Sequence, residues 1–163
     1  MNPKILIAGS WGSQIHEEPL ANAFERIGCL VYKFKWHHYF EDETKWGFSN
    51  KLRLKVECRF SCGKSVSEIN CDLIKAVEVF SPDIIFIYRP QPISKDTIYR
   101  IKDKNENIRI ACYNNDDPFS LKYAFYYWKR FIRSIKHYDM VFSYRRKNID
   151  EYYNRQYGYI LDR

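Results

Sequence analysis

Short apolar runs alternate along this chain with amphipathic segments of helical period, and this alternation limits the fold more than any other feature. Strands are predicted at residues 4–8, 29–34, 83–88, 108–112 and 140–143. Helices are predicted between them at residues 19–27, 65–80, 94–104, 121–136 and 147–156. The run at 83–88 is apolar on both faces, which is typical of a parallel strand covered by helices. We therefore expect a doubly wound, Rossmann-like α/β domain with right-handed crossovers.

Two further segments enlarge the predicted sheet. Residues 51–60 alternate strictly between apolar and charged side chains, which predicts a half-exposed strand near a sheet edge. Residues 159–161 predict the start of another strand. The expectation is one domain over residues 1–163, with a mostly parallel sheet of about six or seven strands and helices on both faces. Ser65 and Glu68 have the spacing of a capping box at the start of one helix.

Composition narrows the class of protein. Hydrophobic residues make up 45% of the chain and aromatic residues 18%, which excludes a disordered polymer. The net charge of +7 favours anionic partners such as nucleotides, phosphosugars or a membrane surface. Nucleic acid is disfavoured because the positive charge is spread along the chain. The sequence has no long apolar run and no signal peptide pattern, so we expect a cytoplasmic protein with reduced cysteines.

A metal site is not predicted. Cys58 and Cys62 lie near Cys71, His37 and His38, but their spacing misses the usual zinc-binding pairs. Residues 62–65 imitate the end of a phosphate-binding loop, yet Cys58 stands where its first glycine belongs. We interpret that match as chance.

Four loops follow predicted strands and should meet at one edge of the sheet, at residues 9–16, 89–92, 114–118 and 144–146. The backbone amides of the first loop could cradle a phosphate or carboxylate, or the loop could be a tight turn into a helix. Its candidate ligand-binding residues are Ser10, Trp11, Gly12 and Ser13. His16 could act as a general base or could be an ordinary polar residue at a helix start.

The loop YNNDDP, residues 113–118, is the strongest indication of function. Asp116 and Asp117 could bind ligand hydroxyls or accept a proton; alternatively, Asp117 or Ser120 could cap the next helix. Asn114 and Asn115 add amide groups beside them.

Two arginines could add positive charge at the same edge. Arg89 could hold a carboxylate or phosphate, or pair with Asp116. Arg145 is similar, or simply solvated.

Two common α/β functions fit the sequence poorly. The first loop is not the G-x-G-x-x-G fingerprint, and no acidic residue ends the second strand to bind a ribose, which argues against a dinucleotide enzyme. Ala8 and Gly9 stand where a receiver domain would have an acidic pair. A non-catalytic ligand-binding or regulatory module stays open as an alternative.

The segments KILIAG, SPDIIF, YNNDDP and YDMVFS together resemble the N-terminal half of a GT-B glycosyltransferase of the spore-maturation-protein type, related to family 4-like sugar transferases. They begin at residues 4, 81, 113 and 138. The resemblance implies that this half binds a glycan or small-molecule acceptor. A C-terminal partner domain would then hold the nucleotide sugar, so no cofactor is expected here and the isolated chain should be inactive.

The same resemblance suggests roles for individual residues. His16 and Asp116 would be catalytic. The substrate-binding residues would be Ser10, Trp11, Gly12, Ser13, Arg89, Asn114, Asn115, Asp117 and Arg145. Peripheral membrane association and a place in cell-envelope glycan synthesis are further expectations.

Overall fold

A computed structural model describes residues 2–12, 15–41, 48–121 and 126–157 of the chain. Within these residues five parallel strands form one sheet in the order β2-β1-β3-β4-β5. The strands are β1 (Lys4–Gly9), β2 (Leu30–Lys35), β3 (Ile84–Tyr88), β4 (Arg109–Tyr113) and β5 (Met140–Phe142). The helices are α1 (Glu17–Arg26), α2 (Phe48–Phe60), α3 (Lys64–Phe80), α4 (Lys95–Lys104), α5 (Lys129–Ser134) and α6 (Arg146–Tyr157), with short 3-10 helices η1 (His37–Phe40) and η2 (Ile135–His137).

The Rossmann-like α/β class is confirmed, and the described residues form five strands rather than about six or seven. The five predicted strands that the structure contains lie close to their predicted bounds. Of the two additional strands, residues 51–60 belong to a helix, and residues 159–161 lie outside the described part of the chain.

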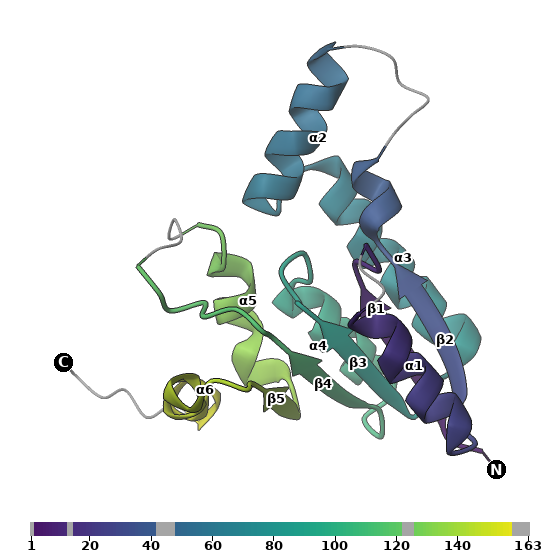
Figure 1. Ribbon diagram of the computed structural model, residues 1–163. Helices are drawn as coiled ribbons and strands as arrows, with labels where there is room; N and C mark the ends of the chain where they lie inside the picture. The colour runs from purple at the N-terminus through teal and green to yellow at the C-terminus, as the bar shows by residue number, and fades with distance from the viewer. Residues whose placement is uncertain (1, 13–14, 42–47, 122–125, 158–163) are drawn as a thin grey trace.

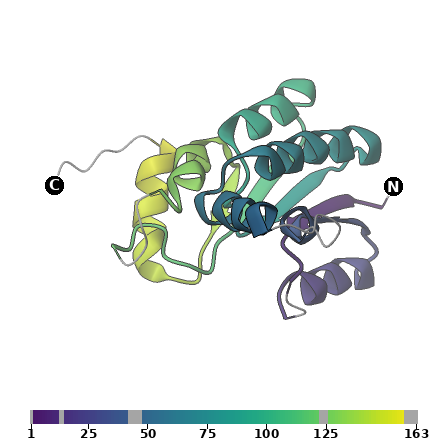
Figure 2. The same cartoon turned by 90° about the horizontal axis from the view of Figure 1, so that it is seen from above.

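Helices cover the two faces of the sheet unequally. In Figure 2, α1 lies on one side, and α3 and α4 lie on the other. The larger core cluster lies on the α3 side and includes Leu73, Ile98, Phe131 and Tyr152, contributed by four different helices. The smaller cluster, on the other side, is built around Ile5, Ile7 and Ala21.

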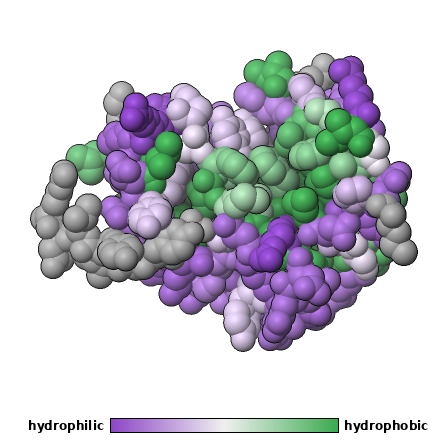
Figure 3. Space-filling view, turned by 90° about the horizontal axis from the view of Figure 1, so that it is seen from below, coloured by the Kyte–Doolittle hydropathy of each residue, from purple (hydrophilic) through white to green (hydrophobic). Residues whose placement is uncertain are grey.

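The face on the α1 side keeps apolar side chains in contact with solvent. Met140 and Phe142 of β5 are 47% and 44% exposed. Phe142 stacks on Phe86 of β3 at a centroid distance of 6.2 Å. Apolar side chains also gather in the middle of the surface seen in Figure 3, between hydrophilic margins.

The expected strand at 51–60 was wrong, because this segment is most of α2. In a helix, the alternating apolar positions divide between two sides rather than one. Leu54 is buried, whereas Leu52, Val56 and Phe60 are exposed. Leucine, lysine, arginine and glutamate all favour helices, and this propensity outweighs the alternation.

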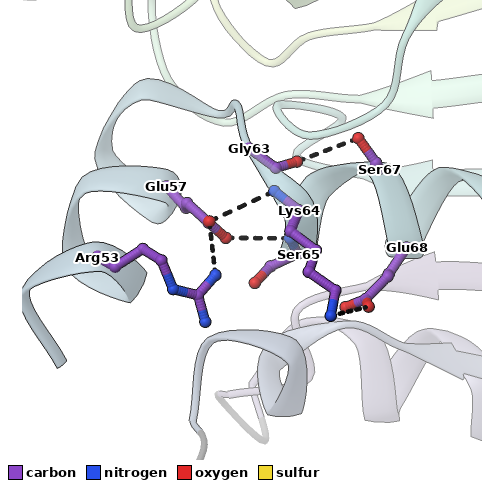
Figure 4. A network of polar contacts seen from close by, with 7 residues as sticks. All are labelled: Arg53, Glu57, Gly63, Lys64, Ser65, Ser67 and Glu68. Carbon is purple, nitrogen blue, oxygen red and sulfur yellow. Dashed lines mark hydrogen bonds and ion pairs between the residues drawn. The ribbon is translucent and has the colours of Figure 1, made fainter. Parts of the chain in front are cut away.

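The predicted capping box at the start of α3 was also wrong. Glu57 of α2 supplies the cap: its carboxylate accepts hydrogen bonds from the backbone N–H of Lys64 at 3.3 Å and of Ser65 at 3.0 Å (Figure 4). Arg53 donates to the same carboxylate at 2.7 Å. Glu68 instead pairs with the side chain of Lys64. A carboxylate from the preceding helix therefore fills the anion position at the helix start.

The predicted helix over 121–136 is shorter than expected. Residues 126–128 form a turn and bend, and α5 begins only at Lys129. Tyr126 stacks on Phe60 of α2 at 4.5 Å, and the Arg59 guanidinium lies 5.5 Å from the ring of Tyr127. These contacts with α2 hold the described part of the segment outside a helix.

Candidate functional site

The sheet has a switch point between β1 and β3. From β1 the chain continues to β2 on one side, whereas from β3 it continues to β4 on the other. The loops after β1 and β3 therefore diverge at the carboxyl edge, where open α/β sheets bind ligands. Because the strands are parallel, the other predicted loops leave the sheet at the same edge (Figure 1).

The glycine loop after β1 already holds a carboxylate of this chain. Glu17, in the first turn of α1, is only 1% exposed, and its Oε1 accepts a hydrogen bond from Trp11 N at 3.0 Å. A Cβ on Gly9 would lie 2.6 Å from Glu17 Oε1, so glycine is required for this close approach. The predicted cradle is thus occupied by Glu17. The pair of glutamates after the glycine loop was the signal that the sequence analysis missed.

Trp11 connects this loop to β2 through a hydrogen bond and contacts with two lysines. Its indole Nε1 donates to Phe34 O at 3.0 Å. The ammonium groups of Lys33 and Lys35 lie 5.7 and 5.2 Å from the tryptophan ring. These contacts favour a structural role for Trp11 over the predicted contact with substrate.

The other predicted residues of this loop are less engaged. Ser10 is half-buried and Gly12 is exposed. Ser10 Oγ would lie 3.3 Å from a Cβ placed on Gly12, so a larger residue would crowd the turn. Ser13 lies outside the described residues.

Tyr88, which the sequence analysis did not single out, lies at the centre of the site. The His16 ring stacks on Tyr88 at 5.0 Å, and Tyr113 stacks on it at 5.6 Å. Tyr88 is 6% exposed, and its buried hydroxyl has no hydrogen-bond partner among the described residues. Burial, assisted by the charge of Glu17, raises the pKa of Tyr88 to about 12. Its phenol is therefore neutral at physiological pH and has an unused O–H donor.

Arg89 and Asp116 join the loops that follow β3 and β4. Arg89 Nη2 donates to Asp116 Oδ2 at 2.6 Å. The backbone of Arg89 is left-handed, with φ of 50°, which is costly for a residue with a side chain. Arg89 Nε is buried and has no partner among the described residues. The ion pair that the sequence analysis left as an alternative is confirmed.

Asp117 ties the loop to α6. Its Oδ1 accepts hydrogen bonds from Asn148 Nδ2 at 2.7 Å and from Phe119 N at 3.1 Å. Burial acts to raise the pKa of Asp117, but these hydrogen bonds and the charge of Lys147 outweigh it and lower the pKa. These contacts favour a structural role for Asp117.

The two asparagines of the loop differ in their burial and in their hydrogen bonds. Asn114 is fully buried, and its Oδ1 accepts a hydrogen bond from Asp116 N at 3.2 Å, so it shapes the turn. Asn115 is half-buried, and its Oδ1 has no partner among the described residues.

Arg145 lies away from the switch point. It follows β5, which β4 separates from β3 in the sheet. Its guanidinium is exposed and lies 5.0 Å from the ring of Tyr144. This arrangement matches the solvated alternative.

The side chains that the structure brings together are His16, Tyr88, Arg89 and Asp116, a set we call the switch-point cluster. It combines an imidazole, a phenol, a guanidinium and a carboxylate, which suits a ligand with several hydroxyl groups. Among the described residues, no three His, Cys, Asp or Glu side chains are placed to hold a metal ion. No helix in this part of the chain is long and apolar enough to cross a membrane.

Comparisons with known proteins leave the family open. No protein-family model matches the sequence, and no curated protein matches it significantly. A structural search finds a Burkholderia pseudomallei protein provisionally described as pilus assembly-related, with a TM-score of 0.43 and 12% sequence identity. The match covers 94% of this chain and 88% of the other. Similarity this distant assigns neither family nor function.

Proposed function

We propose that this domain binds the acceptor of a nucleotide-sugar-dependent glycosyltransferase. The observation that carries the proposal is the switch-point cluster, in which the buried Tyr88 hydroxyl has no hydrogen-bond partner among the residues that the structure describes. Leaving a buried polar group unsatisfied costs about 1–3 kcal/mol, so a ligand that satisfies it gains specificity. A sugar supplies several hydroxyls to such a site.

Two residues of the cluster suit the reaction itself. His16 is exposed and stacks on Tyr88, and an imidazole nitrogen can serve as a general base, so it is the candidate to take a proton from the attacking hydroxyl. Asp116 is held in position by Arg89, and carboxylate oxygens accept hydrogen bonds from hydroxyl groups. We therefore assign Asp116 to orienting a second hydroxyl, and Tyr88 to donating a hydrogen bond.

The filled anion position favours an acceptor over a nucleotide at this site. Glu17 accepts the Trp11 amide of the loop after β1, where a phosphate would otherwise bind, and its negative charge repels one. The nucleotide sugar would then bind elsewhere in the complete enzyme.

Binding to the domain can be measured directly by calorimetry with neutral and acidic oligosaccharides. Tyr88→Phe removes the hydroxyl and keeps the ring, so we expect affinity to fall about tenfold. Tyr99→Phe is a matched control, because Tyr99 is 62% exposed on α4. Equal affinities for the two variants would contradict the assignment of Tyr88.

Catalysis is tested on the full-length product of the gene with radiolabelled nucleotide sugars. We expect His16→Gln to lower kcat by about 10²–10⁴-fold while acceptor binding changes little. No transfer to any acceptor by the full-length wild-type protein would refute the enzyme assignment.

A second candidate is a non-catalytic α/β module that binds a small metabolite. It is favoured by the Arg89–Asp116 ion pair, which occupies the one carboxylate of the cluster. A thermal-shift screen separates the two: stabilisation by small metabolites, with no response to sugars, supports the module.

A further inference from the structure

A groove runs along the open edge of the sheet, on a different part of the molecule from the switch-point cluster. β2 is an edge strand, and the groove lies between it, η1 and α3. Its volume is about 560 Å³. The apolar residues that line it are Tyr32, Phe34, Tyr39, Ala76 and Val79. Val79 is 88% exposed and Tyr32 is 40% exposed, so the apolar lining is open to solvent.

The backbone of β2 can pair with one more strand. Leu30 N donates to Pro3 O at 2.8 Å, and Trp36 N donates to Gly9 O at 3.1 Å, so the even-numbered residues point their amides toward β1. Along a strand these directions alternate. The amide and carbonyl groups of Val31, Lys33 and Lys35 therefore face the open edge. Such an edge is a template for strand addition.

The side chains of β2 divide by chemistry between the two faces of the sheet. Tyr32 stacks on Phe80 of α3 at 5.3 Å, which places the even-numbered, apolar side chains on the α3 side. Lys33 and Lys35 both lie over the Trp11 ring, and Lys33 pairs with Glu18 of α1 at 2.8 Å, so the lysines occupy the other side.

A strand added beside β2 would extend both faces of the sheet, the apolar one on the α3 side and the one that carries the lysines. Alternate side chains of that strand would enter the groove beside Phe34 and Val79, and the remaining ones would lie beside Lys33 and Lys35. The lining contains three lysines, at 33, 35 and 75, against the single carboxylate of Asp72, which pairs with Lys75. Lys33 pairs with Glu18 and Glu25, so among the described residues Lys35 is the lining lysine with no ion pair. The pattern that fits is an alternation of apolar and acidic residues.

We propose that the β2 edge binds an extended segment of a partner protein in which acidic residues alternate with β-branched apolar ones. A second copy of this chain is a poor occupant, because β2 paired with β2 would bring lysines together. Lysines on an edge strand prevent such self-pairing. Lys35 would attract an acidic side chain of an added strand.

The test uses a fluorescent peptide of about eight residues that alternates Glu and Val, with both ends blocked. We expect it to bind, and we expect the Lys-Val peptide of the same length to fail. Two N-methylated versions then probe the backbone bonds, each methylated on one of the two alternating sets of amides. Only one set faces β2, so one version should lose affinity by about tenfold or more and the other should keep it.

A protein variant probes the groove. Val79→Glu places a negative charge in its wall and should weaken binding of the Glu-Val peptide by about tenfold. Ile149→Glu on α6 is the matched control, because Ile149 is also an exposed helical residue and lies beyond the opposite end of the sheet. Equal binding of the two methylated peptides, equal effects of the two variants, or self-association in place of peptide binding would overturn the proposal.

Discussion

A glutamate side chain lies close to a glycine near the start of both α1 and α3, but the two glutamates come from different parts of the chain. A Cβ on Gly63, directly before α3, or on Gly9, at the end of β1, would lie 2.6 Å from a glutamate side chain. At α1 the glutamate is Glu17, which belongs to the helix's own first turn and accepts one loop amide. At α3 it is Glu57, which comes from the preceding helix and accepts two amides of α3.

Glu17 makes a local contact with the loop before its own helix, whereas Glu57 makes a tertiary contact between two helices. Glu17 keeps the loop after β1 closed beside Tyr88, so its contribution is to the shape of the candidate site. Glu57 fixes the angle between α2 and α3 and also satisfies Arg53. We therefore expect changes at α3 to affect stability more than the corresponding changes at α1.

The largest effect is expected from adding a methyl group to the glycines. Gly63 has φ of 91°, so Gly63→Ala combines a left-handed backbone with a steric clash and should lower the free energy of unfolding by about 2–4 kcal/mol. Gly9 has no such φ, and Gly9→Ala should cost about 1–2 kcal/mol as Glu17 shifts. Urea unfolding followed by circular dichroism measures both; a larger loss for Gly9→Ala would reverse the comparison.

Removing the carboxylates gives the next largest effect. Glu57→Ala leaves two helix amides and Arg53 without an acceptor and should cost about 2 kcal/mol, whereas Glu17→Ala should cost about 1 kcal/mol. Glu68→Ala is the control, because the residue predicted to cap α3 is half-exposed and should change stability by less than about 0.5 kcal/mol. If Glu68→Ala lowered the free energy of unfolding as much as Glu57→Ala, the result would support the predicted capping box instead.

The pH dependence of stability sharpens the comparison. Burial acts to raise the pKa of Glu57, but hydrogen bonds from Ser65 and Arg53 outweigh it, so the folded pKa lies below 4.5. A depressed folded pKa adds stability above the unfolded pKa, and this contribution disappears as the pH falls through the folded value. The stability difference between the wild type and Glu57→Gln should therefore stay constant above about pH 5 and shrink below pH 4.5. Unfolding curves measured over this pH range provide the check; a difference that grows toward acid would have the wrong sign.

The smallest effect concerns Tyr88. Burial, with a smaller contribution from Glu17, raises its folded pKa from 10.0 to about 12. The stability this shift contributes is present below pH 10 and is lost as the pH rises toward 12. In an absorbance titration, Tyr88→Phe should remove one late-ionising tyrosine, and Glu17→Gln should make that tyrosine ionise at lower pH. An unchanged titration in Glu17→Gln would show that the charge of Glu17 does not raise the pKa of Tyr88.

The sheet and its loops could be predicted because the signals are local. Five apolar runs become parallel strands, and parallel strands bring their carboxyl ends to one edge. The Arg89–Asp116 pair follows from this geometry, since the two residues end neighbouring strands. Helix α4 begins where expected, with Ser94 as its cap.

The remaining features depend on contacts between distant segments. The alternation at 51–60 cannot distinguish a strand from a helix with two apolar sides, and helix propensity together with burial of Leu54 on one side favours α2. Glu57 is a cap only because α2 turns back toward α3. In the sequence Tyr88 is an ordinary residue of an apolar strand, and only the fold shows that its hydroxyl has no partner in the described part of the chain.

The interior of the sheet and its β5 edge differ in local stability. β1 is bordered by strands on both sides and its residues Leu6, Ile7 and Ala8 are fully buried. β5 has three residues, one neighbour, and two side chains open to water in the described part of the chain. Amide protons of β5 should therefore exchange with deuterium through small local openings, whereas those of β1 should wait for the whole domain to unfold.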